Sequence, residues 1–426
     1  MCYQITINRD FCTGGNEIYL SDLKISNFRN LVDAGLLLEP GVTVIYGDNG
    51  NGKSNLLEAI YILSVGKSQR AINDKDLISF NSSGIDATNE GLEIHTKVSA
   101  NIQRSDESTK IQFNLFEIDS SSDTSRYTTN KQQNHRKNLP RQKSLTKLVR
   151  VNGIRKKISD FVGEVNAVLF TVQDLELIYG APKIRRRYLD MLISQHDREY
   201  LRALQRYQKT IFQRNHLLRN IKSGVSKLPE LAPWDQNIMD DGGYIISTRS
   251  KIIKHLSELC ISQHHLLSPL KEQLKLMYLT DTEETISQAG HADISDVLKD
   301  KLSASLNFDI NRGFTSVGPH RDDFKVTING LDSARFASRG QARIATLSIK
   351  LAEAQYLSDV RGENPLILLD DVFSELDPVR RELVWDLISD YEQSLITTSD
   401  MDNIPKDGIS NMKKFKIFEG KIDPVD

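Results

Sequence analysis

Cysteine is scarce in this sequence of 426 residues, which contains only three. They are Cys2, Cys12 and Cys260, and none of them belongs to a CxxC pair. The spacing excludes a disulfide framework and a zinc site built on paired cysteines. It is typical of a protein that folds in a reducing compartment.

Long apolar runs are also missing. No stretch approaches the roughly 18 apolar residues that a membrane span requires, so we expect no membrane association. Residues 1–17 lack the basic start and the apolar centre of a secretion signal, so we expect a cytoplasmic protein. Neither sign of charge is in excess, because 55 basic and 57 acidic residues give a formal net charge of −2. Any contact with DNA must therefore come from local clusters of cations.

The sequence does contain a glycine-rich string, at residues 47–54, that matches GxxxxGK[ST]. It follows an apolar, strand-like run and precedes a helical pattern that ends at Gly66. Glycines let several backbone N–H groups face one point, and the helix adds the positive end of its dipole there. In such a loop Lys53 reaches the β- and γ-phosphates of a nucleotide, and the Ser54 hydroxyl ligates Mg²⁺. The candidate ATP-binding residues are Gly47, Asp48, Asn49, Gly50, Asn51, Gly52, Lys53 and Ser54.

Two carboxylates follow the apolar run 366–369, which reads as a buried strand. Because ligands of α/β sheets bind at the carboxyl ends of strands, Asp370 is well placed to hold the metal. Asp371 is the natural candidate to orient or deprotonate an attacking water. Without the phosphate loop, a solvated acidic turn would be the better interpretation.

The order of patterns along the chain is α/β, then helical, then α/β. It predicts an α/β fold: a P-loop NTPase core with an inserted helical lobe. We expect an extension at 1–17, the first part of the ATPase lobe at 18–185, a helical arm at 186–310 and the second part of the ATPase lobe at 311–426. Residues 101–148 are rich in Ser, Thr, Asn, Gln and charge, and we expect them to form a long polar loop. We also expect residues 280–300 to be a polar connection.

Several strings resemble the RecF family of ABC-type ATPases, and they occur in the order typical of that family over roughly residues 18–400. They are LKISNFRNL, YGDNGNGKSNLLEAIY, RRRYLD, SVGPHRDDF, SRGQAR and LLDDVFSELDPVRR. Residues 374–377 resemble the D-loop of ABC-type ATPases. Residues 338–341 lie where that superfamily has its signature motif, although a plain helix cap would be the better interpretation without the resemblance.

The resemblance implies a slow, DNA-stimulated ATPase of recombinational repair and replication that serves as a switch. Members of the family dimerise on ATP, with each nucleotide between the phosphate loop of one subunit and the signature motif of the other. The dimer binds DNA at single-strand gaps and, with RecR and RecO, helps to load RecA. Carried onto this chain, Ser338, Gly340 and Gln341 would contact the nucleotide of a partner subunit. Lys53, Asp370 and Asp371 would form the catalytic set.

The sequence departs at three places from the pattern of the family or of ABC proteins in general. Arg339 stands in the signature motif where a Gln is usual, and Thr397, Thr398 or Ser399 stands where many ABC proteins have a switch histidine. Asp371 is an Asp where most ABC enzymes have Glu, which fits slow hydrolysis. Gln173 is a candidate for the Q-loop glutamine, and a plain loop residue is an equally good interpretation.

Basic residues cluster in three places that are candidates for DNA contact: 131–159, 201–229 and the run Arg185, Arg186 and Arg187, which the RRRYLD resemblance places within the core. The residues proposed there are Arg136, Lys137, Arg202, Arg206 and Lys209, and such clusters release counterions from a phosphate backbone. Solvated charge is the competing interpretation. Three other functions remain open: a transporter-type ABC ATPase, an SMC-like structural head and a metabolic kinase. A transporter ATPase would need a full signature motif and a switch histidine, and this sequence has neither. An SMC-like head would need long heptad arms, and the helical stretch here is too short for them.

Overall fold

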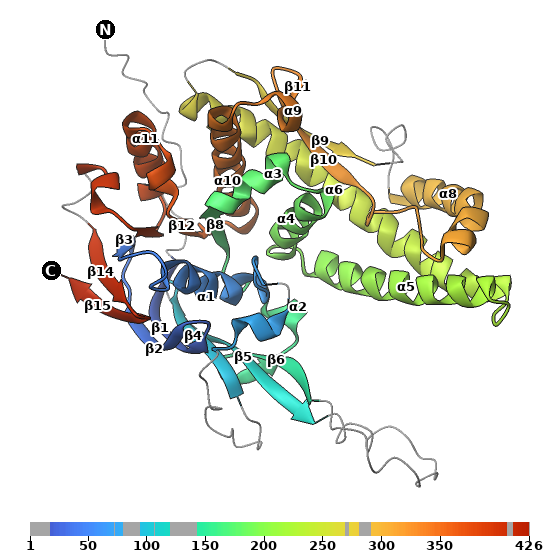
Figure 1. The fold of residues 1–426 in the computed structure, drawn as a ribbon, viewed down its shortest axis with the longest axis horizontal. Helices are drawn as coiled ribbons and strands as arrows, with labels where there is room; N and C mark the ends of the chain where they lie inside the picture. The colour runs from blue at the N-terminus through green and yellow to red at the C-terminus, as the bar shows by residue number, and fades with distance from the viewer. Residues whose placement is uncertain are drawn as a thin grey trace.

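The computed structural model describes residues 18–71, 73–79, 94–105, 107–119, 143–268, 272–280, 291–406 and 412–425. Two six-stranded sheets and a three-stranded sheet are present in this part of the chain. Figure 1 shows the two large sheets on one side of the molecule and a group of long helices that projects from them. Within the described residues, every helix is too short or too polar to cross a bilayer.

The central sheet has the strand order β15-β14-β3-β13-β12-β8 and is parallel except for β15. Alternate residues of its inner strands enter two different cores: Ile367 and Leu369 face one, and Leu366 and Leu368 face the other. Burial on both faces explains why these strands read as short continuous apolar runs. Its strands are β3 (Gly41–Tyr46), β8 (Ala167–Thr171), β12 (Leu366–Asp370), β13 (Gln393–Thr398), β14 (Lys413–Phe418) and β15 (Lys421–Val425).

The second sheet is antiparallel, and helix α1 (Lys53–Val65) lies between it and the central sheet. Leu56, Leu57 and Ile60 of α1 are fully buried in the core that these three elements share. The strands are β1 (Tyr19–Phe28), β2 (Leu31–Leu37), β4 (Ile94–Gln103), β5 (Ser108–Asp119), β6 (Lys143–Val151) and β7 (Ile154–Lys156). This core holds the helix that follows the phosphate loop in one position.

Long helices form an arm that extends away from the sheets (Figure 1). They are α4 (Pro182–Ser194), α5 (Arg198–Lys222), α6 (Ala232–Leu267) and α8 (His291–Arg312). The small sheet is made of β9 (Leu274–Leu279), β10 (Asp323–Ile328) and β11 (Leu331–Asp332). Since β9 pairs with β10, this sheet crosses the boundary expected at residue 310.

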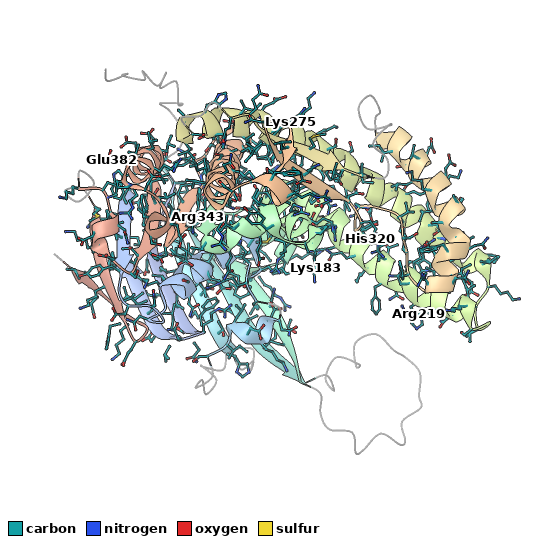
Figure 2. All side chains as sticks on the ribbon, turned by 45° about the horizontal axis from the view of Figure 1, so that its top comes forward. Lys183, Arg219, Lys275, His320, Arg343 and Glu382 are labelled. Carbon is teal, nitrogen blue, oxygen red and sulfur yellow. The ribbon has the colours of Figure 1, made fainter. Side chains whose placement is uncertain are left out.

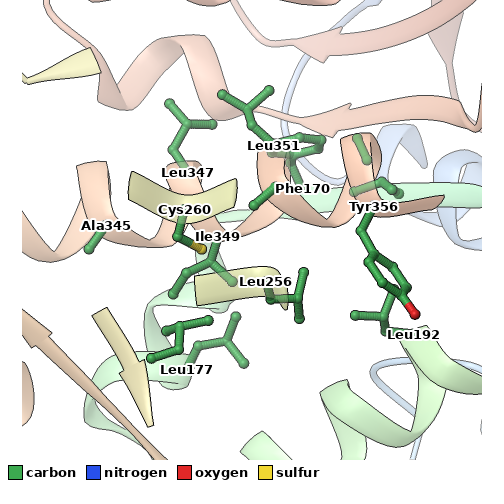
Figure 3. Close-up of a cluster of buried hydrophobic side chains, with 14 of the residues drawn as sticks. Phe170, Leu177, Leu192, Leu256, Cys260, Ala345, Leu347, Ile349, Leu351 and Tyr356 are labelled. Atoms are coloured by element: carbon green, nitrogen blue, oxygen red, sulfur yellow. The ribbon is translucent and has the colours of Figure 1, made fainter. Parts of the chain in front are cut away.

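Helix α10 (Arg339–Arg361) covers the other face of the central sheet and joins it to the arm. Its apolar side packs on β8 and on α6, where Leu256 and Cys260 meet Ala345, Leu347 and Ile349 (Figure 3). The remaining helices are α2 (Ile158–Phe161), α3 (Glu176–Tyr179), α9 (Ser333–Phe336) and α11 (Pro378–Ser389). Short 3₁₀ turns occur at η1 (Asp74–Leu77), η3 (Val172–Leu175), η4 (Leu228–Leu231), η5 (Val372–Glu375) and η6 (Met401–Asn403).

Two expectations about irregular segments are wrong. The range 101–148 is not one long loop, because it contains the end of β4, all of β5 and the start of β6. Ile111, Phe113 and Leu115 alternate with polar residues and are buried, and this period of two was masked by the polar composition around it. The range 280–300 is likewise not only a connection, since α8 begins at His291.

Candidate nucleotide site

The register of the central sheet brings four strand ends to one edge. Asp370 at the end of β12 pairs with Thr397 of β13 on one side and with Thr171 of β8 on the other. Thr397 in turn pairs with Ile45, just before the phosphate loop. Segments that are more than 300 residues apart in sequence, such as Ser54 and Asp370, therefore meet at a single site.

The phosphate loop has the conformation that its glycines allow. Gly52 has φ of 110°, a left-handed value that L side chains rarely adopt, and a Cβ there would meet the side chain of Asn30 at 2.9 Å. A Cβ on Gly47 would lie 2.3 Å from the carbonyl oxygen of Ile417. Helix α1 then begins at Lys53 without a side-chain cap, so its first amide groups are available to an anion.

Lys53 is held in the loop by backbone carbonyls. Its Nζ donates to the oxygens of Gly47, at 2.5 Å, and Asp48, at 3.0 Å, and only 6% of the residue is exposed. Burial lowers the pKa of Lys53, while Asp371, Asp370 and Asp48 oppose that shift. The arrangement presents a cation at the centre of the loop, opposite two carboxylates.

Asp370 is the acceptor of a short hydroxyl network. Its Oδ1 accepts from Ser54 Oγ at 2.7 Å and from Thr397 Oγ1 at 2.9 Å. Thr397 also supplies the carbonyl, at 3.1 Å, and the hydroxyl, at 3.2 Å, that accept from the Asp371 backbone N–H. Thr397 thus holds the side chain of Asp370 and the backbone of Asp371.

Asp371 differs from Asp370 in conformation and in electrostatics. Its φ is 54°, in the left-handed region, so the chain turns sharply at the end of β12. Burial raises the pKa of Asp371, and the nearby Asp370 adds to that shift, whereas Ser374 and Lys53 oppose it. Its Oδ1 atom is buried and has no hydrogen-bond partner within the described residues, which leaves it available to a ligand or a water.

These side chains line a pocket of about 230 Å³ at the sheet edge. Gln173, in the turn after β8, lines the same pocket, as do Asn49 and Gly50 of the phosphate loop. It follows β8, which pairs with β12 on the side away from the phosphate loop, and its assignment as a Q-loop glutamine stays a prediction. A second, smaller pocket lies beside it, between the turn after β8, helix α10 and the turn η5.

Arg70 is a pocket residue that the sequence patterns did not reveal. It lies in the loop after α1, and its guanidinium donates to Ser54 O at 3.0 Å and Glu58 Oε2 at 2.8 Å. Glu58 is buried, and burial disfavours its charge, but Arg29, Arg70 and Ser68 together hold its pKa below the ordinary value. The sequence feature that could have indicated it is the string GKSQR directly after the helix, in which Arg70 follows Gly66 by four residues.

Residues 338–341 cap helix α10 within their own subunit. Ser338 Oγ accepts from the Gln341 N–H at 3.2 Å, and the Ser338 N–H donates to Gln341 Oε1 at 2.9 Å, which forms a capping box. Ser338, Arg339 and Gly340 are all exposed. Gln341 does not reach the pocket of its own subunit, because its amide nitrogen donates to Glu272 at 2.7 Å.

Residues 374–377, which the sequence predicts to be a D-loop, contact helix α10 and begin helix α11. Glu375 forms an ion pair with Arg343 of α10, which Figure 2 shows on that helix. Asp377 caps α11 by accepting from the Arg380 N–H at 3.1 Å. The two sides of the smaller pocket are therefore joined by the Arg343–Glu375 pair.

The candidate DNA-binding residues differ in whether their charge is already paired with an acid. Arg202 pairs with Asp160 at 2.8 Å, and Arg206 pairs with Asp241 at 2.8 Å and Glu199 at 3.1 Å. Lys209 is exposed on the same helix, α5. Arg136 and Lys137 lie outside the described residues. Charge on Arg202 and Arg206 is thus already balanced within the subunit.

The family match covers nearly the whole chain. A family model described as "RecF/RecN/SMC N terminal domain" matches residues 19–416. The DNA replication and repair protein RecF of Halothermothrix orenii is 31% identical over 95% of this chain and 98% of its own length. The RecF of Symbiobacterium thermophilum is 34% identical over 91% of this chain and 93% of its own length.

Solved structures give the same result. A structure described as the recombination mediator protein RecF-ATP in the RecFOR pathway is 32% identical and has a TM-score of 0.80, over 97% of this chain and 100% of that one. Its RecF-ATPrS counterpart has a TM-score of 0.79. The predicted fold class, an ABC-type ATPase core with an inserted helical lobe, is confirmed. On sequence, on fold and on the order of its motifs, this chain belongs to the RecF family of DNA replication and repair proteins.

Proposed function

We propose that this protein binds ATP and Mg²⁺ at the edge of its central sheet, dimerises on the nucleotide and uses slow, DNA-stimulated hydrolysis as a switch. The observation that carries the proposal is the convergence of the phosphate loop, Asp370, Asp371 and Gln173 on one pocket. Structures of RecF with ATP, which share 32% identity with this chain over nearly its full length, support it.

The residues at the pocket fit a magnesium ion. Mg²⁺ prefers a few hard oxygen ligands together with phosphates and water, and the Ser54 hydroxyl and the Asp370 carboxylate, 2.7 Å apart, supply such oxygens. Ser54 and Asp370 would hold the ion, which would neutralise charge that develops on the phosphates. Lys53 and the first amides of α1 bind the β- and γ-phosphates.

Hydrolysis depends on the placement of one water. Asp371, with its raised pKa and its turn away from β12, is the residue that orients or deprotonates it. Thr397 fixes the backbone of Asp371, and Gln173 faces the water from the other side of the pocket. An Asp reaches less far than a Glu would, which accords with slow turnover.

The signature motif acts on a second subunit. Ser338, Arg339 and Gly340 are exposed at the amino end of the 23-residue helix α10, which is a favourable position for an anion. They cap the γ-phosphate held by the phosphate loop of the partner. Arg339 brings a cation to that contact. Because ADP has no γ-phosphate, ATP and not ADP joins two subunits.

The nucleotide-bound dimer binds DNA at single-strand gaps by contact with the phosphate backbone. With RecR and RecO it helps to load RecA. The names of the related proteins, which place RecF in DNA repair and in the RecFOR pathway, support this role.

The test is the mass of the protein in solution without nucleotide, with ADP–Mg²⁺ and with ATP–Mg²⁺. Wild type is expected to dimerise with ATP alone, and Lys53→Arg is expected to remain a monomer in all three conditions. Asp371→Asn serves as the matched control, because it retains the phosphate loop and should dimerise with ATP. A dimer of equal stability in every condition would exclude the switch.

A further inference from the structure

The long arm helix α6 reaches from the arm to helix α10, which begins with the predicted signature motif, residues 338–341, and is called the signature helix below. Its last turns pack on α10 through an apolar seam that includes Cys260 and Ile349 (Figure 3). Two polar contacts run along this seam: Gln263 Nε2 donates to Gln355 Oε1 at 2.8 Å, and His264 Nδ1 lies 3.1 Å from Ser348 Oγ. The end of the arm helix and the signature helix are thus fixed to each other.

A buried carboxylate, Glu272, stands at the signature end of this seam. It is 5% exposed and lies between α6 and β9. Its Oε1 accepts from Gln341 Nε2 at 2.7 Å, and its Oε2 lies 3.3 Å from Ser268 Oγ and 3.4 Å from His264 Nε2. All three partners come from α6, its end, or the first turn of α10, so this acid joins the arm to the signature motif.

The carboxylate determines which way the Gln341 amide faces. A carboxylate can only accept, so the NH₂ group of Gln341 turns toward Glu272 and its Oε1 turns toward the Ser338 N–H. The same residue donates its backbone N–H to Ser338 Oγ. Ser338 is therefore held at both its backbone and its hydroxyl by a residue whose orientation Glu272 sets.

We propose that Glu272 is a positioning residue for nucleotide capture between subunits. Through Gln341 it fixes Ser338 and the following exposed residues in the conformation that receives the partner's γ-phosphate. Through His264 it makes that conformation depend on the arm helix α6. This inference rests on the proposed ATP-driven dimer and names a residue, outside the recognised motifs, that sets its strength.

The experiment compares Glu272→Ala, Glu272→Gln and Gln263→Ala in the full chain. ATP affinity of the monomer is measured at low protein concentration, and dimerisation with ATP–Mg²⁺ is measured by mass over a concentration series. Loss of a hydrogen bond to a charged group should raise the dimer dissociation constant of Glu272→Ala by about tenfold. Monomer ATP affinity should be unchanged, and Glu272→Gln, whose amide oxygen can still accept from Gln341, should stay within about threefold of wild type.

The control and a double variant separate positioning from general packing. Gln263→Ala removes a contact between the same two helices away from the signature motif and should dimerise like wild type. Gln341→Ala should weaken the dimer as Glu272→Ala does, and the double variant should be no weaker than Gln341→Ala alone. If Glu272→Ala does not fold, Glu272→Met takes its place in every comparison, because it removes the acceptor for Gln341 while it fills a similar volume.

The outcomes are distinct. If wild type dimerises with ATP and the variants Glu272→Ala and Gln341→Ala dimerise as strongly as wild type does, this inference is wrong while the proposed function stands. Equal weakening in Gln263→Ala would reduce Glu272 to a packing role and also overturn the inference. If wild type remains monomeric with ATP, the proposed function fails and this inference fails with it.

Discussion

At the scale of single residues, Asp370 and Asp371 are neighbours with different surroundings, from which different roles are predicted. Asp370 accepts two hydroxyl bonds, whereas Asp371 turns into the pocket with a buried oxygen that has no partner among the described residues. We predict that Asp371→Asn lowers the ATPase rate by about 100-fold or more, since a positioned base contributes at least that much. ATP-dependent dimerisation should persist.

The pH dependence of turnover gives a second readout for Asp371. Its pKa is raised, so the ionised base is lost at a higher pH than for an ordinary aspartate as the solution is acidified. The wild-type ATPase profile should therefore show an acid limb from this carboxyl group, and the residual activity of Asp371→Asn should lack that limb. A shared limb in both proteins would assign it to another group.

His320 has a structural role in the arm. Its Nδ1 lies 2.7 Å from the Tyr207 hydroxyl and its Nε2 lies 3.0 Å from the Thr315 carbonyl oxygen, and Figure 2 shows it in the arm. Burial lowers its pKa to about 4, from an ordinary value of 6.5. Both ring nitrogens therefore have partners within the arm, and the residue is outside the nucleotide pocket.

We predict that His320 makes the fold less stable in acid. Because its folded pKa is lowered, its contribution is complete above pH 6.5 and is lost as the pH falls from 6.5 toward 4, by about 1 to 3 kcal/mol in total. In urea unfolding, the stability difference between wild type and His320→Asn should shrink over that interval. A difference that is constant with pH would show that His320 does not titrate there.

At the scale of elements, a buried cation joins three helices of the arm. Arg214 of α5 is fully buried and donates to Asp235 of α6 at 2.7 Å, to Asp309 of α8 at 2.8 Å and to the Thr315 hydroxyl at 2.9 Å. Arg214→Met leaves the buried Asp309 without its cation and should cost about 3–5 kcal/mol of unfolding free energy. Arg206→Gln, on the exposed side of α5, should cost less than about 1 kcal/mol. Similar losses in both would contradict the role of burial.

The elements also show where sequence reasoning succeeds and where it does not. The phosphate loop, Asp370 and α1 are local patterns, because a glycine string, a strand end and a helical period are each encoded by adjacent residues. The strand β5 was missed because Ile111, Phe113 and Leu115 lie in polar surroundings, and Arg70 was missed because its role depends on a fold that returns it to Ser54. Glu272 could not be found from spacing at all, since it reaches Gln341 across 69 residues.

At the scale of the whole molecule, charge sets how DNA can be held. The net charge is −2, so the protein as a whole does not attract a polyanion, and the candidate residues Arg202 and Arg206 are already paired with acids. The proposed DNA contact would therefore need several exposed cations, such as Lys209. The proposed ATP-joined dimer would present two copies of each, which would double the number of phosphates contacted.

This doubling predicts the salt dependence of DNA binding. The slope of log K against log salt is about −0.9 per phosphate contact on duplex DNA, so the slope with ATP should be about twice the slope with ADP. Lys209→Ala should reduce the ATP slope by about two, one for each subunit, whereas Arg206→Ala should change it less because Asp241 and Glu199 already neutralise that guanidinium. Equal slopes with ATP and ADP would mean that one subunit makes all the contacts, and that the nucleotide controls DNA binding by some means other than joining two charged surfaces.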